Sequence, residues 1–532
     1  MGTGTRSTVR IALFVALGGF LMGFDASVIS GVVGFVRTEF DLTSLQLGWG
    51  VASLTLSATV SMLVAGPLSD RLGRRPVLRL AAALFALSAI ASAVAPTFAT
   101  LVVARMLGGL GVGAALIIAP MYIAEMAPSD KRGRLVSFNQ LNIVVGISVA
   151  FFSNYLILGL TESPAEWVQW LGVDHWPWRW MLGIEALPAL LYLLALLFVP
   201  ESPRWLAMRG REAEARHVLE ETCGPDRAGQ ELEDVLQSLR AQPGEQRSTI
   251  ATADLPTADL PVADLLAPAM RTVLTLGLAV AVLQQITGIN AVFFYAPMIF
   301  EQSGIGRDAS FMQAVLVGLV NVVFTVVAML LIDKIGRRPL LLGGLAGITA
   351  CMLTLSWAFA DATYTLDRQA LAGLPVEMDT AELTALQDRV FPSDLAFREA
   401  VSKQIGAEQF ERHKAVLIAA AMDVRSLLIL VSILGFVASF AVSLGPVMWV
   451  RFSELFPNTL RGLAVSVVGV VNSAVSFTVQ LVFPWELEHL GTATTFLLYG
   501  AFALIGLVFI WYKLPETKER SLEELQRELV EA

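Results

Sequence analysis

Long apolar stretches separated by short polar segments run along almost the whole chain. Each is about as long as a helix that crosses a bilayer, which needs about 20 mostly apolar residues. The pattern predicts twelve membrane-spanning helices, over residues 10–36, 46–68, 76–95, 98–125, 135–158, 178–199, 271–300, 309–332, 339–360, 425–455, 461–484 and 492–513. Two longer polar segments, 204–268 and 361–424, interrupt the series.

The composition indicates an integral membrane protein. Of the 532 residues, 55% are hydrophobic and only 16% are charged, whereas soluble domains carry about 25% charged residues. The net charge of −9 argues against a nucleic-acid partner. Cys223 and Cys351 follow no spacing motif, so we expect neither a disulfide nor a metal site. The first apolar stretch shows no small-residue cleavage site, and we interpret it as a retained span.

Positive charge predicts the orientation, because Lys and Arg gather in cytoplasmic loops. Basic loops follow the second, fourth and eighth spans, at 71–79, 131–134 and 334–338. The alternate loops 96–98 and 485–491 contain no Lys or Arg. We therefore expect both termini in the cytoplasm.

The two halves of the chain repeat one another. Asp70-Arg-Leu-Gly-Arg-Arg-Pro76 returns as Asp333-Lys-Ile-Gly-Arg-Arg-Pro339. Parallel repeats of six spans imply two pseudo-symmetric halves related by an axis normal to the membrane. We predict an all-α membrane protein with three domains, namely a six-helix half over 1–203, a cytoplasmic helical linker over 204–268, and a second six-helix half over 269–532. The second half includes an extracellular insertion, 361–424, and a cytoplasmic tail.

Three amide side chains, Gln284, Gln285 and Asn290, lie inside one apolar stretch. An unpaired polar group is costly at membrane depth, and an amide offers both donors and an acceptor to a ligand rich in hydroxyl groups. On a straight helix Asn290 would point away from Gln285. We predict a break at Gly288 that turns all three toward one ligand. Hydrogen bonding between neighbouring helices is the alternative interpretation.

Two opposite charges, Asp25 and Arg105, fall inside predicted spans. Counted along the helices, both lie roughly 14–18 Å below the outer face at a rise of about 1.5 Å per residue. Either charge alone would be expensive there, so we expect an ion pair. The pair is either purely structural or part of a proton-coupled mechanism.

Charged residues also recur at the cytoplasmic ends of the spans in both halves. They are Asp70, Arg71, Arg74, Arg75, Glu125, Arg132, Glu201 and Arg204 in the first half, and Asp333, Arg337, Arg338, Glu454, Arg461 and Glu516 in the second. A solvated face with orienting arginines is the simpler interpretation. Because Glu125 and Glu454 recur in register and orientation requires no acids, we favour an inner latch that closes when the site faces outward.

Four motifs, in order and in register, resemble the sugar porter family of the major facilitator superfamily. They are Asp-Arg-x-Gly-Arg-Arg after the second span, Pro-Glu-Ser-Pro-Arg-Trp-Leu at 200–206, Gln-Gln-x-x-Gly-Ile-Asn at 284–290 and Pro-Glu-Thr-Lys at 515–518. The resemblance implies a twelve-helix transporter that works by alternating access around a central sugar site. By matching motifs, it implies substrate contacts at Gln140, Gln284, Gln285, Asn290, Asn321, Trp449 and Asn472.

Two positions depart from the family pattern and leave the choice of sugar open. Phe294 stands where many members have tyrosine, and Ser473 where many have tryptophan. Asp25 resembles the protonatable aspartate of bacterial sugar–proton symporters, with Arg105 as its partner. We therefore expect a monomeric symporter of protons and a hexose, pentose or inositol in the cell membrane, with no cofactor, metal or enzymatic activity. A facilitative uniporter and a sugar sensor that does not transport are the alternatives.

Overall fold

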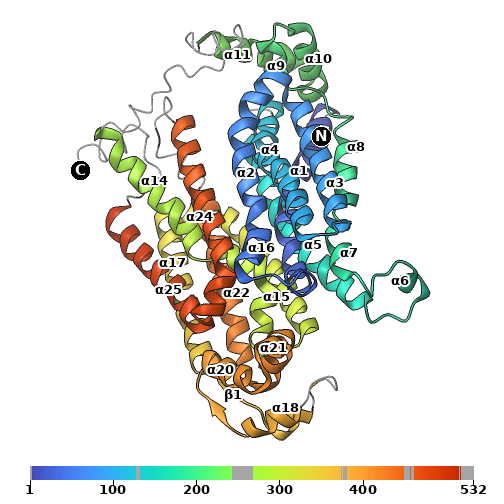
Figure 1. Ribbon diagram of the computed structural model, residues 1–532. Coiled ribbons are helices and arrows are strands. Elements are labelled where there is room, and N and C mark those ends of the chain that lie inside the picture. Colours follow the sequence, from blue (N-terminus) through green and yellow to red (C-terminus); the bar gives the residue numbers. More distant parts are fainter. Residues whose placement is uncertain are drawn as a thin grey trace. The chain divides into compact units, whose positions relative to one another are not determined.

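The computed structural model describes residues 3–127, 132–241, 268–372, 374, 380–448, 456, 461–514 and 516. Helices dominate this part of the chain, and eleven of them are long and apolar enough to cross a membrane (Figure 1). The chain divides into two compact units. They comprise Met1–Ala26, Ser53–Ala150 and Leu182–Leu266 in the first, and Ser27–Ala52, Phe151–Met181 and Ala267–Ala532 in the second.

The first half of the chain supplies five long helices. They are α1 (Thr3–Glu39), α2 (Ser44–Leu72), α3 (Arg74–Ala93), α4 (Phe98–Met126) and α5 (Arg132–Leu160). The predicted sixth span, 178–199, is instead divided into α7 (Pro177–Gly183) and α8 (Ala186–Ala195). Pro188 in the first turn of α8 explains the break, because a proline cannot bond to the carbonyl four residues earlier. The predicted sixth span is therefore present as two shorter helices.

Small residues allow α2 and α4 to pack closely. A Cβ atom added at Gly109 would overlap Ser57 Oγ and the carbonyl oxygen of Leu54, and one added at Gly113 would overlap the carbonyl oxygen of Ala58. Glycine is thus the one residue that fits at these positions, as expected for close helix packing in a membrane.

The linker between the halves forms α9 (Pro203–Met208), α10 (Glu212–Cys223) and α11 (Pro225–Ala241). Trp205, Leu219 and Leu232 from these helices share a buried cluster with Tyr122 of α4. Trp205 Nε1 also donates a hydrogen bond to the carbonyl oxygen of Asp70 at 3.0 Å. The linker therefore packs on the first half, and its predicted helices are confirmed as far as residue 241.

The second half supplies the remaining six candidate spans, one of which is divided into α14 and α15. They are α14 (Pro268–Ile286), α15 (Ile289–Glu301), α16 (Arg307–Ile335), α17 (Arg337–Ala360), α22 (Ser426–Val442), α24 (Arg461–His489) and α25 (Thr492–Lys513). The predicted break between α14 and α15 is confirmed. Gly288 there has φ +88° and ψ +15°, a left-handed conformation that glycine adopts without steric cost.

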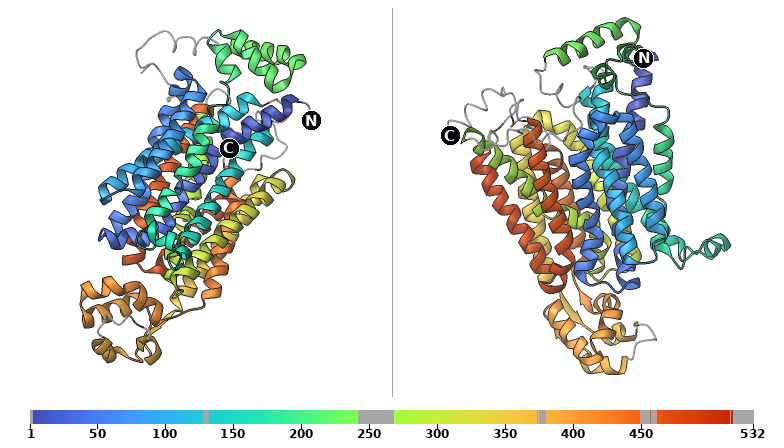
Figure 2. Two further views of the ribbon diagram at one scale, coloured as in Figure 1. Left: turned by 90° about the vertical axis from the view of Figure 1, so that its right-hand side faces the viewer. Right: turned by 45° about the horizontal axis from the view of Figure 1, so that its top comes forward.

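The insertion folds around a core of its own. Its elements are β1 (Thr363–Thr365), α18 (Arg368–Ala372), α19 (Thr380–Leu383), the 3-10 turn Thr384–Leu386, β2 (Val390–Phe391), α20 (Asp394–Ile405), α21 (Ala407–Ala421) and β3 (Met422–Asp423). The strands form an antiparallel sheet in the order β2-β1-β3. Tyr364 of β1 stacks on Phe397 of α20 within a buried cluster. Figure 2 shows this lobe in orange beyond the ends of the second-half helices. The insertion is therefore not wholly helical, because three short segments here pair as strands.

The outer ends of α1 and α2 belong to the second unit. Arg37 Nη2 lies 3.5 Å from Glu488 Oε2, and the ring of Trp49 packs edge-on against Phe477 with 5.9 Å between ring centroids. On this side, helices from the two halves of the chain are therefore in direct contact.

We predict that Gly109→Ala destabilises the protein, because the added methyl group meets Ser57 and Leu54. Overpacking of this kind costs about 1–3 kcal/mol. Gly34→Ala is the matched control, since an added Cβ there meets nothing within 4 Å. Thermal unfolding in detergent should show a lower midpoint for Gly109→Ala alone. Equal midpoints for the two variants would contradict the assigned α2–α4 contact.

Candidate functional site

The break at Gly288 brings the predicted amide side chains together. Asn290 Nδ2 donates to Gln285 Oε1 at 2.7 Å, and Gln285 Nε2 donates to Gln284 Oε1 at 3.1 Å. A straight helix would direct Asn290 away from Gln285, whereas the left-handed glycine lets α15 start in a new direction. The local backbone therefore creates the cluster that the sequence predicted.

Helix α24 completes this amide cluster with Asn472. Asn472 Nδ2 donates to Gln284 Oε1 at 2.9 Å, and its Oδ1 accepts a hydrogen bond from Gln285 Nε2 at 3.1 Å. Gln284, Gln285 and Asn472 are 6%, 8% and 7% exposed. Four of the seven predicted substrate residues thus form one buried network, which we call the amide cluster: Gln284, Gln285, Asn290 and Asn472.

Two further polar residues of α24 extend the network and were not found from the sequence. Ser476 Oγ accepts hydrogen bonds from Asn290 Nδ2 at 2.6 Å and from Gln480 Nε2 at 2.8 Å. Residues 472, 476 and 480 are four apart, which places them on one face of a helix. That spacing of polar residues inside an apolar span is the signal that sequence analysis should have used.

Hydrogen-bond geometry gives the amide cluster a definite polarity. Asn290 Nδ2 uses both its hydrogens within the network, as does Gln285 Nε2. Asn472 Nδ2 likewise donates to the carbonyl oxygen of Ala281 and to Gln284. Asn290 Oδ1, by contrast, accepts no hydrogen bond from the described residues. The cluster therefore offers a ligand mainly acceptor oxygens.

The other predicted substrate residues are less closely tied to this network. Asn321 is 5% exposed within α16, and Gln140 is an exposed residue of α5. Trp449 lies outside the described residues. Convergence of Gln140, Asn321 and Trp449 with the amide cluster stays a prediction.

Asp25 and Arg105 form the buried ion pair that the sequence predicted. Arg105 Nη1 lies 2.6 Å from Asp25 Oδ1 and 3.1 Å from the carbonyl oxygen of Asp25. The two side chains are only 1% and 2% exposed. Water therefore does little to screen the attraction between them, and each charge is the main compensation for the other.

The second carboxylate oxygen of Asp25 is left unpaired. Asp25 Oδ2 accepts no hydrogen bond within the described part of the chain. It faces Gly108, where an added Cβ would lie 2.5 Å from Oδ2 and 2.6 Å from Ser88 Oγ. The absence of a side chain at Gly108 makes room for the carboxylate, and Oδ2 is an oxygen at which a proton can bind while Oδ1 stays next to Arg105.

Glu185 is a third buried charged group, and sequence analysis missed it. It lies at the break between α7 and α8, is 3% exposed, and is close enough to interact electrostatically with Asp25 and Arg105. Its Oε1 has no hydrogen-bond partner among the described residues. An acid within the apolar stretch 178–199, three residues before a proline, was the available signal.

At the predicted cytoplasmic end of the first half, Arg74 joins several acidic side chains. Its Nε and Nη2 atoms each lie 3.1 Å from Glu125, and Nη1 lies 2.9 Å from Asp70 Oδ1. Ser202 Oγ donates to Glu125 Oε2 at 2.5 Å. Arg74 and Ser202 are 4% and 0% exposed, and the Glu125 side chain is 9% exposed, so these three form a buried network. The Asp70 side chain, at 55% exposure, lies at its solvated edge.

The two halves also share a way of capping a helix. Glu201 accepts hydrogen bonds from the backbone N–H groups of Arg74 and Arg75, the first two residues of α3, at 3.0 and 3.2 Å. Glu516 does the same for Arg337 and Arg338 at the start of α17, at 3.2 and 2.9 Å. Negative charge at a helix N-terminus is stabilising, which gives these acids a structural role.

The other predicted gate residues are only partly described. Arg71 is exposed near the end of α2, and Arg204 is half-buried in α9. Glu454 and the side chains of Arg132, Asp333 and Arg461 lie outside the described residues. Each contact described for these gate residues joins two residues of the same half of the chain. The latch between the halves therefore stays a prediction.

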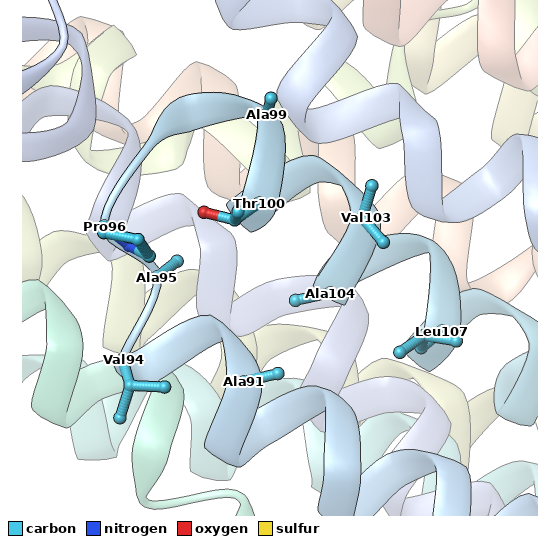
Figure 3. Close-up of a pocket in the computed structure, with 9 residues that line it drawn as sticks. All are labelled: Ala91, Val94, Ala95, Pro96, Ala99, Thr100, Val103, Ala104 and Leu107. Carbon is cyan, nitrogen blue, oxygen red and sulfur yellow. The ribbon is translucent and has the colours of Figure 1, made fainter.

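A surface cavity near the outer ends of α3 and α4 is unsuited to a sugar (Figure 3). It measures about 430 Å³, and Thr100 is its one polar lining side chain besides apolar residues such as Val94, Val103 and Leu107. Thr100 Oγ1 already donates to the carbonyl oxygen of Thr97. No group of His, Cys, Asp and Glu in the described part of the chain is arranged to hold a metal ion.

Comparison with known proteins gives one consistent answer. Residues 11–372 and 413–529 match the family described as "Sugar (and other) transporter". The chain is 33% identical over 519 residues to the arabinose-proton symporter of Bacillus subtilis, covering 98% of this chain and 94% of that protein. It is also 33% identical over 527 residues to a glucose transport protein of Synechocystis, covering 98% of each. Its fold is similar to a partially occluded, inward-open structure of the xylose transporter XylE from E. coli, with a TM-score of 0.72 and 29% identity over 97% of this chain and 100% of that one.

We predict that Glu125→Gln shifts the protein toward a state open to the cytoplasm, because it removes the charge that Arg74 contacts. A shift of about 1.4 kcal/mol changes the ratio of two states tenfold. A cysteine replacing the exposed Gln140, with both native cysteines changed to serine, should then react faster with a reagent applied from the cytoplasmic side. Glu221→Gln, in the exposed face of α10, is the control. Unchanged reactivity combined with lower thermal stability would mean that Glu125 only ties helix ends together.

Proposed function

Because the chain belongs to the sugar transporter family, we propose that it carries a hexose, pentose or inositol across the cell membrane together with a proton. The observation that carries this proposal is the buried Asp25–Arg105 pair, with one carboxylate oxygen left unpaired beside Gly108. That oxygen is where a proton can bind while the other stays beside Arg105. The relative from Bacillus subtilis, named an arabinose-proton symporter, supports the same function.

The amide cluster supplies the proposed sugar site. Each sugar hydroxyl can donate one hydrogen bond, and the cluster presents acceptor oxygens to receive it. The side-chain N–H groups of Gln285 and Asn290 are already engaged within the network. Because the network is formed before a sugar arrives, little side-chain freedom is lost on binding.

Coupling follows from the switch that the ion pair permits. While Arg105 contacts Asp25, the carboxylate is stabilised in its charged form. When helix movement separates the two groups, an uncompensated carboxylate in an apolar site takes up a proton. The arginine cannot lose its own proton, so the aspartate is the group that changes state. Suppose that the carrier can reorient only when Asp25 is protonated or is paired with Arg105 again. Sugar movement would then be linked to proton movement.

A facilitative uniporter is the second candidate. A relative from Synechocystis is named a glucose transport protein, so sugar transport is common to both candidates. The two functions differ in one measurable property, because only the symporter moves protons when sugar moves. The third candidate is a sensor that binds sugar without transporting it. Robust counterflow of labelled sugar would exclude a sensor.

For the sugar site, Gln285→Ala should weaken sugar binding by about 1–3 kcal/mol, because it leaves partners in the amide cluster and on the sugar unpaired. Thr478→Ala is the matched control on α24, since Thr478 is exposed and bonds only to the carbonyl oxygen of Ala474. Calorimetry or sugar-dependent thermal shifts would measure the loss. If Gln285→Ala binds sugar with wild-type affinity, the assignment of the amide cluster to the sugar site is wrong.

The polarity of the cluster makes a separate prediction about sugar analogues. Fluorine cannot donate a hydrogen bond, so replacing a contacted hydroxyl by fluorine should weaken binding as much as removing it, by about 1–3 kcal/mol. Competition against labelled sugar by each deoxy analogue and its fluorinated counterpart would test this. If the fluorinated sugars bind like the parent sugar, the site donates hydrogen bonds and the assigned polarity is wrong.

For proton coupling, Asp25→Asn should abolish concentrative uptake under an imposed pH gradient while leaving part of the counterflow. The amide keeps the shape of the carboxylate but holds the neutral state. Uptake into proteoliposomes with an acidic exterior is the measurement, and Glu212→Gln, an exposed acid of α10, is the control. Accumulation by Asp25→Asn against a sugar gradient would show that the ion pair is structural.

A further inference from the structure

Three exposed tryptophans mark a segment that sugar transport does not explain. Trp167, Trp170 and Trp176 are 51%, 83% and 55% exposed. They belong to residues 161–176, which we call the tryptophan loop and which contain the short helix α6 (Glu166–Trp170). Tryptophan is normally well buried in proteins, so three exposed indoles within ten positions require a partner outside the chain.

The tryptophan loop is a built structure with an interior of its own. Val168 and Val173 are buried at 0% and 3% exposure, and the N–H of Val173 bonds to the carbonyl oxygen of Val168 at 3.1 Å. Just after the loop, Trp178 Nε1 donates to Glu39 Oε2 at 2.5 Å, which fixes its base to the end of α1. The loop thus buries its valines while presenting larger aromatic rings outward.

Its position connects it to the membrane-facing surface. The loop follows α5 and precedes α7, on the side predicted to be extracellular. Figures 1 and 2 show α6 projecting sideways from the ends of these two helices. On the last turns of α5, Phe152 and Leu156 are each 49% exposed, which in a membrane span is a lipid-facing surface. The exposed tryptophans follow this span directly along the chain.

We propose that the tryptophan loop lies in the headgroup layer of the outer leaflet and anchors the protein there. An indole combines a large apolar ring with one N–H donor, which suits it to the boundary between hydrocarbon and water. Glu162, Glu166 and Asp174 make the loop acidic, so the contact depends on aromatic insertion and not on attraction to anionic lipid. Aromatic rings also stack against sugars, and the experiment separates that alternative.

The test uses full-length protein with Cys223 and Cys351 changed to serine and one cysteine introduced by Gln169→Cys. Gln169 is exposed between the tryptophans, so all three remain in place. An environment-sensitive fluorophore on this cysteine is examined in phosphatidylcholine vesicles, with and without phosphatidylglycerol. Val390→Cys is the control, since Val390 is 61% exposed on β2 of the insertion.

We expect emission at position 169 to be blue-shifted and quenched by a lipid spin label near the headgroup, with similar quenching in both lipid mixtures. Emission at position 390 should instead be quenched by aqueous iodide. Adding Trp167→Ser and Trp170→Ser should abolish the lipid quenching at position 169 while transport persists. Iodide quenching at position 169 equal to that at 390 would overturn the proposal. So would a response to added sugar without any response to the lipid spin label.

Discussion

The ion pair between Asp25 and Arg105 constrains the rest of the first half. Taking two charges out of water costs several kcal/mol per ion, and close pairing is what offsets that cost. Their separation of 2.6 Å therefore demands exact placement of α1 against α4. Gly108 provides the space for the carboxylate, and Glu185 adds a second acid within electrostatic reach. The local arrangement thus brings two acids and one arginine within electrostatic reach of one another.

Helix breaks position the proposed functional groups in both halves. The left-handed Gly288 separates α14 from α15 and turns Asn290 back toward Gln285, while the break before Pro188 places Glu185 between α7 and α8. Irregular backbone inside a membrane protein is tolerated where it is surrounded by protein or lines a cavity. Polar residues at such breaks are the feature that distinguishes a site from a purely apolar span.

Several features could be predicted because they depend on local chemistry. Apolar length predicts spans, a glycine beside amides predicts the break at Gly288, and opposite charges at one depth predict the Asp25–Arg105 pair. Other features depend on packing that no single stretch reveals. The sequence pattern does not show that Ser476 completes the amide cluster, that Glu185 lies near Asp25, or that 361–424 contains strands around Tyr364. Twelve spans were expected, and the sixth is divided near Pro188. Apolar length alone does not reveal such a break.

Proton movement driven by sugar is the most direct test of this account. The wild-type protein would be reconstituted in proteoliposomes in weakly buffered medium, and pentoses, hexoses and inositols would be added in turn while the external pH is recorded. The account predicts that a transported sugar makes the medium more alkaline as protons enter with it. Rapid counterflow of the same sugar with no change in pH would contradict coupling and make the protein a uniporter.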